Sequence, residues 1–252
     1  IFLFTILFTS NLNAKPIPPG AGDGDVAANI LFLVDSSASM GRWIGSDGLG
    51  RVRGVSYDSD GNILIGQNAR RAAGAVLRYT SAGARDTSFT PIRRIPRGGC
   101  GQHIDPRRNI MNQRFRKAST VKFVDNAINN EGIIFIVSQE RRLLNYVFGF
   151  SENGRNCRFA ISGSQGGRMF DIDVKNIGGT NYLFMAGIRN RSRGYFKVTN
   201  LTTMQSTYTE FNNRNHITRR HHRFSVNNDG SRIYFSDAAN GGDLVGYALN
   251  AS

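Results

Sequence analysis

Three residues early in the chain carry side chains suited to binding a metal ion. Asp35, Ser37 and Ser39 occupy alternate positions, so one loop offers a carboxylate and two hydroxyl groups. Oxygen ligands of this kind bind hard divalent cations such as Mg²⁺ and Ca²⁺. A coordination position that these ligands leave open accepts an acidic group from a partner. The spacing therefore predicts a metal site at these three residues, with Mg²⁺ or Ca²⁺ as the cofactor.

The stretch before this loop, residues 30–34 (ILFLV), is wholly apolar and predicts a buried strand. The strand and its D-x-S-x-S loop resemble the first strand and metal-ion-dependent adhesion site of a von Willebrand A domain. That resemblance implies further βα units that supply a Thr and an Asp ligand, but residues 41–48 lead directly into another pattern. Two interpretations stay open. An interrupted A domain resumes beyond residue 252, or residues 30–44 are a fragment of a repeat with the shape of residues 233–247.

Arginine dominates the charge of the chain. The formal net charge is +14, and 27 of the 32 basic residues are Arg. The planar guanidinium group suits carboxylate, sulfate and phosphate groups, so a polyanionic partner is one interpretation and a solvated surface is the other. No basic run is interleaved with aromatic residues as in nucleic-acid motifs, so no specific nucleic-acid partner is expected. The candidate polyanion-binding residues are Arg93, Arg94, Arg97, Arg107, Arg108, Arg219, Arg220 and Arg223.

Other groups give little support for catalysis. The chain has four His residues and lacks a nucleophile elbow, a zinc-protease motif, a P-loop and a dinucleotide fingerprint. The DSDGN stretch, residues 58–62, indicates a hairpin turn rather than a calcium loop. Asp171 and Asp173 share one face of a strand, which is expected to be an exposed outer strand, with a channel lining as the alternative.

A repeated plan sets the predicted fold. Residues 52–83, 121–154, 170–200 and 222–250 each contain an alternating strand, an Asp/Asn/Gly turn, a strongly apolar strand, a polar loop and a third strand. The expected turn glycines are Gly61, Gly132, Gly179 and Gly230. This spacing is typical of β-propeller blades. We therefore predict an all-β β-propeller with about four recognisable blades, and we expect further blades outside the chain.

Two local motifs extend this prediction by resemblance. The stretch VSYDSDGNILIG is similar to NHL and related propeller repeats, in which a strand, a D-x-x-G-N turn and an apolar strand recur. Residues 76–89 resemble a repeat of bacterial surface proteins, R-x-x-x-x-G-x-x-D-x-S-F. That motif falls on Arg78, Gly83, Asp86, Ser88 and Phe89 and occurs once. The resemblance implies a bacterial surface propeller protein.

The N-terminal segments indicate that the protein is exported from the cytoplasm. Residues 1–14 have the apolar core and cleavage site of a signal peptide, and residues 15–29 form a Pro/Gly-rich linker. Residues 30–50 hold the A-like strand or partial blade, and residues 51–252 hold the blades, with a basic insertion at 92–118 expected to form a long loop on one face. In an oxidising compartment Cys100 and Cys157 form a disulfide, with two free buried thiols as the alternative.

The predicted function is a secreted, periplasmic or cell-surface binding or adhesion module without catalysis and without a transmembrane segment. Its expected partner is an extracellular protein or an anionic polysaccharide surface. Open blade edges also predict self-association. The alternatives are a lactonase-like propeller hydrolase with a channel-bound divalent metal and a structural surface-layer or filament component.

Overall fold

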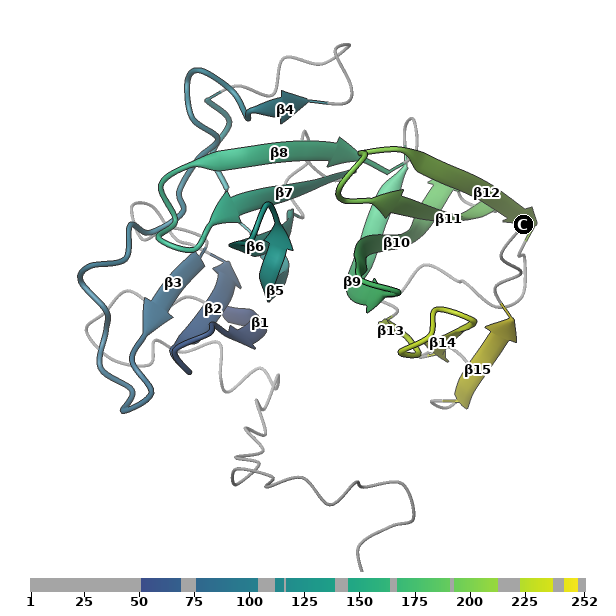
Figure 1. The fold of residues 1–252 in the computed structure, drawn as a ribbon, viewed down its shortest axis with the longest axis horizontal. Helices are drawn as coiled ribbons and strands as arrows, with labels where there is room; N and C mark the ends of the chain where they lie inside the picture. The colour runs from purple at the N-terminus through teal and green to yellow at the C-terminus, as the bar shows by residue number, and fades with distance from the viewer. Residues whose placement is uncertain are drawn as a thin grey trace, which may run out of the picture. The chain divides into compact units, whose positions relative to one another are not determined.

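The computed structural model describes residues 51–68, 76–103, 112–115, 117–138, 145–163, 167–190, 193–212, 223–237 and 243–248. Over these ranges the chain forms strands and no helix (Figure 1), so none of them contains a helix able to cross a membrane. Of two compact units, Ile1–Val34 and Asp35–Ser252, only the second contains described residues. The predicted signal peptide, the linker and the metal loop of Asp35, Ser37 and Ser39 lie outside them.

The strands form four sheets, antiparallel apart from one short parallel edge strand in the second, and each is built from consecutive segments of the chain. The first sheet contains β1 (Arg51–Tyr57), β2 (Ile63–Asn68) and β3 (Val76–Tyr79). The second contains β5 (Ala118–Ile128), β6 (Glu131–Ser138), β7 (Tyr146–Ser151) and β8 (Cys157–Ser162), with β4 (Gln102–His103) added parallel to β8. The third contains β9 (Arg168–Ile177), β10 (Thr180–Asn190), β11 (Arg193–Asn200) and β12 (Ser206–Asn212). The fourth contains β13 (Phe224–Val226), β14 (Arg232–Asp237) and β15 (Asp243–Ala248).

A tight hairpin joins the first two strands of every sheet. In three sheets the predicted glycine adopts a positive φ: 76° at Gly61, 81° at Gly179 and 74° at Gly230. The prediction for Gly132 is wrong, because this residue lies inside β6 beneath the Phe123 ring. The turn there uses Asn129 and Asn130, with φ of 51° and 60°. Asparagine tolerates this conformation because its short polar side chain bonds locally.

The second strand of each middle sheet is buried on both faces, which explains its apolar sequence. In β6, Ile134 and Ile136 belong to the hydrophobic cluster shared with the first sheet. The alternate residues Ile133, Phe135 and Val137 belong to the cluster shared with the third sheet. In β10 the same alternation assigns Leu183 and Met185 to the second cluster, and Phe184 and Ala186 to the cluster shared with the fourth sheet. Successive sheets therefore pack face to face.

The first strands of successive sheets are also neighbours. Strand β5 lies against β1 and β9, and β9 lies against β13. The inner strands approach each other closely at Gly54 in β1, where an added Cβ would lie 2.9 Å from the backbone nitrogen of Val121. Sheets in chain order that pack face to face and meet along their first strands are the blades of a β-propeller. The predicted all-β propeller class is therefore confirmed, with β1, β5, β9 and β13 as the inner strands.

Replacing Gly54 with Ala is expected to disturb the contact between the first two sheets. The new methyl group meets backbone rather than a flexible side chain, so the strands must separate, at a cost of about 1–3 kcal/mol in unfolding free energy. Urea denaturation measures this difference. The matched control is Gly98→Ala, because nothing lies within 4 Å of a Cβ added there. Equal stability of the two variants would contradict the close contact.

Candidate functional site

Two buried acidic residues lie on the inner strand β9. Asp171 is 5% exposed and Asp173 is 3% exposed. They occupy alternate positions and therefore point to the same side of the strand. The prediction that they lie on an exposed outer strand is wrong. Strand β9 pairs with β10 along one edge, and its acidic side chains meet β5 and residues 223–226.

Asp171 accepts hydrogen bonds from both neighbouring sheets. The Thr120 hydroxyl in β5 donates to it at 2.8 Å, and the Phe224 amide in β13 donates at 3.3 Å. An ion pair with Arg223 at 3.1 Å compensates its charge. Burial raises the pKa of the Asp171 carboxyl group, while the Arg223 charge and the hydrogen bonds oppose this rise. The carboxylate thus joins the second, third and fourth sheets.

Asp173 repeats this arrangement one step along the strand. The Val226 amide of β13 donates to its Oδ2 at 2.9 Å, and the Val174 amide donates to its Oδ1 at 2.9 Å. Lys122 of β5 forms an ion pair with Oδ1, and Lys175 lies 3.7 Å from Oδ2. All four carboxylate oxygens of the two acids therefore accept hydrogen bonds from the protein. These oxygens connect strands, which leaves them poorly suited to act as a general base or a metal ligand.

Arg223, a predicted polyanion-binding residue, lies immediately before β13 and contacts all three preceding sheets. Its Nη1 donates to Thr120 and to Asp171. Its Nη2 donates to the main-chain oxygens of Arg53, at 3.1 Å, and Ser119, at 3.2 Å. We name Thr120, Lys122, Asp171, Asp173, Lys175 and Arg223 the inner-strand cluster.

A second acidic group lies at the first hairpin. The carboxylate oxygens of Asp58, Asp60 and Glu152 lie within 4.8 Å of one another. Asp58 is already occupied, since it accepts from the Asn62 amide at 2.8 Å, the Asn62 side chain at 3.0 Å and Arg78 at 3.2 Å. These bonds fix the turn over residues 58–62 that the sequence predicts. Asp58 therefore serves to stabilise this turn.

Residues 78–89, which resemble a repeat of bacterial surface proteins, form a local network around Arg78. Its Nε donates to Asp86 at 2.6 Å, and its guanidinium group lies 5.2 Å from the Phe89 ring centroid. Asp86 also accepts from the Ser88 amide at 2.8 Å and the Ser88 hydroxyl at 2.6 Å. Gly83 completes the loop with φ of 84°. The motif therefore fixes the chain just before the basic insertion.

The basic insertion presents arginine side chains on an anchored backbone. Arg94 pairs with Arg114 across an antiparallel bridge flanked by two hydrogen bonds, Ile95 N to Gln113 O at 2.9 Å and Phe115 N to Arg93 O at 2.8 Å. Arg94 and Arg114 therefore form a non-hydrogen-bonded pair, in which opposing side chains approach most closely.

The apolar residues of this segment, Ile92, Ile95 and Phe115, are buried in the first hydrophobic cluster. The arginines that this backbone exposes are Arg93, Arg94, Arg97 and Arg114, and we name them the arginine segment. Within the described ranges none of the four takes part in a salt bridge. Arg107, Arg108, Arg219 and Arg220 lie outside these ranges.

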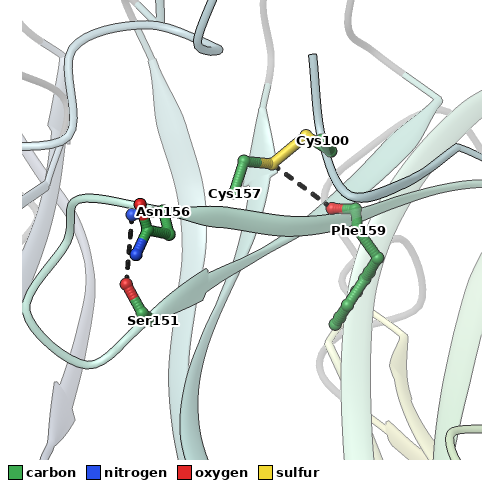
Figure 2. Close-up of a disulfide and its surroundings, with 5 residues drawn as sticks. All are labelled: Cys100, Ser151, Asn156, Cys157 and Phe159. Carbon is green, nitrogen blue, oxygen red and sulfur yellow. Dashed lines mark hydrogen bonds between the residues drawn. A yellow bond between two sulfur atoms is a disulfide. The ribbon is translucent and has the colours of Figure 1, made fainter. Parts of the chain in front are cut away.

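A disulfide fastens this insertion to the outer edge of the second sheet. Cys100 and Cys157 are bonded, with their Cα atoms 4.7 Å apart (Figure 2). The Gly101 amide donates to the Cys157 oxygen at 3.1 Å, and β4 continues the pairing with β8. Of the two alternatives that the sequence left open, the structure has the bridge.

Four residues of the inner-strand cluster and the arginine segment were not predicted from the sequence: Thr120, Lys122, Lys175 and Arg114. The first three share a usable signal, since T-x-K (residues 120–122) and D-x-D-x-K (residues 171–175) occupy the starts of equivalent repeats. Arg114 carries no such signal, because its pairing with Arg94 depends on tertiary structure.

No protein-family model and no curated protein matches the sequence, so neither the NHL-type nor the von Willebrand A resemblance has a family match. Among solved structures, a Bacteroides uniformis protein assigned as a 6-phosphogluconolactonase has a TM-score of 0.48 and 14% identity, over 84% of this chain and 55% of that one. Hydrazine synthase of Kuenenia stuttgartiensis has a TM-score of 0.40 and 10% identity, over 83% of this chain and 69% of that one. The dihydro-heme d1 dehydrogenase NirN has a TM-score of 0.35 and 11% identity, over 80% of this chain and 56% of that one.

This chain thus spans little more than half the length of the first of these structures. At such TM-scores and identities, the likenesses assign no activity to it.

The Asp86 network predicts a pH dependence of stability. The Ser88 hydroxyl and then Arg78 hold the pKa of the Asp86 carboxyl group at about 2, against an ordinary 3.8, although burial opposes this. A lowered pKa stabilises the fold above pH 3.8, and the stabilisation is lost as the pH falls towards 2. Asp86→Asn should therefore lower the unfolding free energy at pH 7 by roughly 1–2 kcal/mol, after allowance for solvent screening, and the deficit should shrink towards pH 3.

Urea denaturation between pH 7 and pH 3 measures this effect. Asp125→Asn is the matched control, because the exposed Asp125 carboxylate accepts hydrogen bonds only from its neighbour Asn126 among the residues that the structure describes. A deficit for Asp86→Asn that stays constant over this range would show that the carboxylate charge is not the stabilising feature.

Proposed function

We propose that this protein is a non-catalytic binding module that attaches to acidic polysaccharide through the arginine segment. The observation that carries the proposal is the opposed pair Arg94 and Arg114. Like charges directly opposite each other destabilise a strand pair. An anionic group placed between them removes the repulsion, and a guanidinium group offers paired donors to carboxylate or sulfate.

The scaffold beneath the arginine segment supports this role. Buried Ile92, Ile95 and Phe115 hold the backbone on the first hydrophobic cluster, and the Cys100–Cys157 disulfide holds the following residues on β8. A rigid backbone lowers the entropy lost on binding. The net charge of +14 adds long-range attraction for any polyanion.

Two further parts of the proposal rest on the chain's chemistry. A disulfide persists in oxidising compartments, which supports a secreted, periplasmic or cell-surface location. The loop of Asp35, Ser37 and Ser39 remains a predicted Mg²⁺ or Ca²⁺ site for adhesion, based on sequence. The hydrolase alternative is less favoured, because protein donors already occupy the carboxylate oxygens of Asp171 and Asp173.

The test is binding to polygalacturonate, a linear polycarboxylate, measured by titration calorimetry at constant low ionic strength. The double variant Arg94→Gln, Arg114→Gln should bind about tenfold more weakly, the equivalent of losing about 1.4 kcal/mol. The control is Arg168→Gln, Arg232→Gln, which removes the same charge from exposed positions on β9 and β14.

If the two double variants lose the same affinity for polygalacturonate, net charge alone explains the binding. That result would contradict specific binding by the arginine segment. Duplex DNA of random sequence serves as the competing polyanion. Tighter binding to this DNA than to polygalacturonate and to dextran sulfate would also contradict the proposal.

A further inference from the structure

Two lysine side chains from different sheets converge on one buried carboxylate. Lys122 reaches Asp173 from β5, and Lys175 reaches it from β9, where its Nζ lies 3.7 Å from Oδ2. The lysine side chains are 34% and 24% exposed, whereas that of Asp173 is 4% exposed. Because both ammonium groups contact the same carboxylate, they lie close to each other at the solvent-facing side of the inner-strand cluster.

The carboxylate that holds these lysines is shared with several other donors. Asp173 also accepts from the amides of Val174 and Val226 and from the Ser225 hydroxyl, at 2.9, 2.9 and 3.4 Å. Two ammonium groups, each with three donors, therefore face one acceptor group that the backbone already uses. Placing charged donors in a partly buried position is costly unless acceptors surround them.

The net charge of the inner-strand cluster also favours an anionic ligand. Lys122, Lys175 and Arg223 face Asp171 and Asp173, which leaves one positive charge in excess. Arg223 already donates to four protein oxygens, so the excess charge falls on the two lysines. Their solvent-facing donors are suited to an acceptor with at least two oxygens and a negative charge.

We propose that Lys122 and Lys175 form a binding site for a small oxyanion, a carboxylate, phosphate or sulfate group that bridges the two ammonium groups. The site is separate from the arginine segment and does not depend on the proposed polysaccharide binding. Asp173 acts in it as a positioning residue, since it fixes both lysines without touching the ligand. A ligand that binds here also joins β5 to β9 and stabilises the contact between the second and third sheets.

The experiment titrates the full chain separately with sodium phosphate, sodium sulfate and monomeric galacturonate, at ionic strength held constant with NaCl. Calorimetry should show saturable binding of at least one of these anions, with one site per chain. Lys122→Gln and Lys175→Gln should each weaken that binding at least tenfold. Lys122→Arg, which keeps the charge, should retain most of it.

The matched control is Lys117→Gln, which removes an exposed lysine immediately before β5 and should bind the anion as the parent does. Urea denaturation verifies that each variant is folded, and if Lys122→Gln does not fold, Lys175→Gln and Lys122→Arg carry the test. The comparison of the three anions shows whether the site binds a phosphate, a sulfate or a carboxylate group.

Absence of saturable binding for all three anions, or unchanged affinity in Lys175→Gln, would overturn the proposal. A separate binding measurement distinguishes the oxyanion site from the proposed binding of polysaccharide. The lysine variants should bind polygalacturonate normally, and the double variant Arg94→Gln, Arg114→Gln should bind the small anion normally.

Discussion

The open edges of the inner strands impose the main physical constraint on this fold. An edge strand leaves backbone N–H groups without ladder partners, and a buried N–H without an acceptor is costly. Side chains of the adjacent sheet supply the acceptors here: Ser56 accepts from the Phe123 amide at 2.9 Å, and Asp171 and Asp173 accept from the Phe224 and Val226 amides. Buried carboxylates are themselves costly unless paired, which accounts for the cations contributed by β5, by β9 and by Arg223 just before β13.

This arrangement divides the charged groups into two roles. The buried carboxylates connect sheets, and their oxygens are occupied by protein donors. The cations retain donors that face solvent, both at Lys122 and Lys175 and on the arginine segment. This distribution supports the proposed binding of anions over acid–base catalysis, and it agrees with the excess of Arg over carboxylates in the composition.

The sequence predicted the features that depend on local pattern. Apolar runs mark the buried second strands, because both faces of β6 and β10 pack against neighbouring sheets. Gly61, Gly179 and Gly230 mark their turns because few residues adopt positive φ. Features that depend on tertiary position were not predictable. The alternating acids of β9 have the pattern of a solvent-facing strand, and nothing local shows that Arg94 lies opposite Arg114. Gly132 failed as a turn marker because two asparagines take that role.

Hydrogen exchange at the Val226 amide tests the central claim most directly. If the Asp173 carboxylate is the acceptor that secures this inner edge, the amide exchanges slowly in the parent. It then exchanges about 10 to 100 times faster in Asp173→Ala, as expected for losing a hydrogen bond to a charged group. The Phe123 amide, which donates to Ser56, should change little and reports on global unfolding. Equal exchange of the Val226 amide in parent and variant would contradict the account.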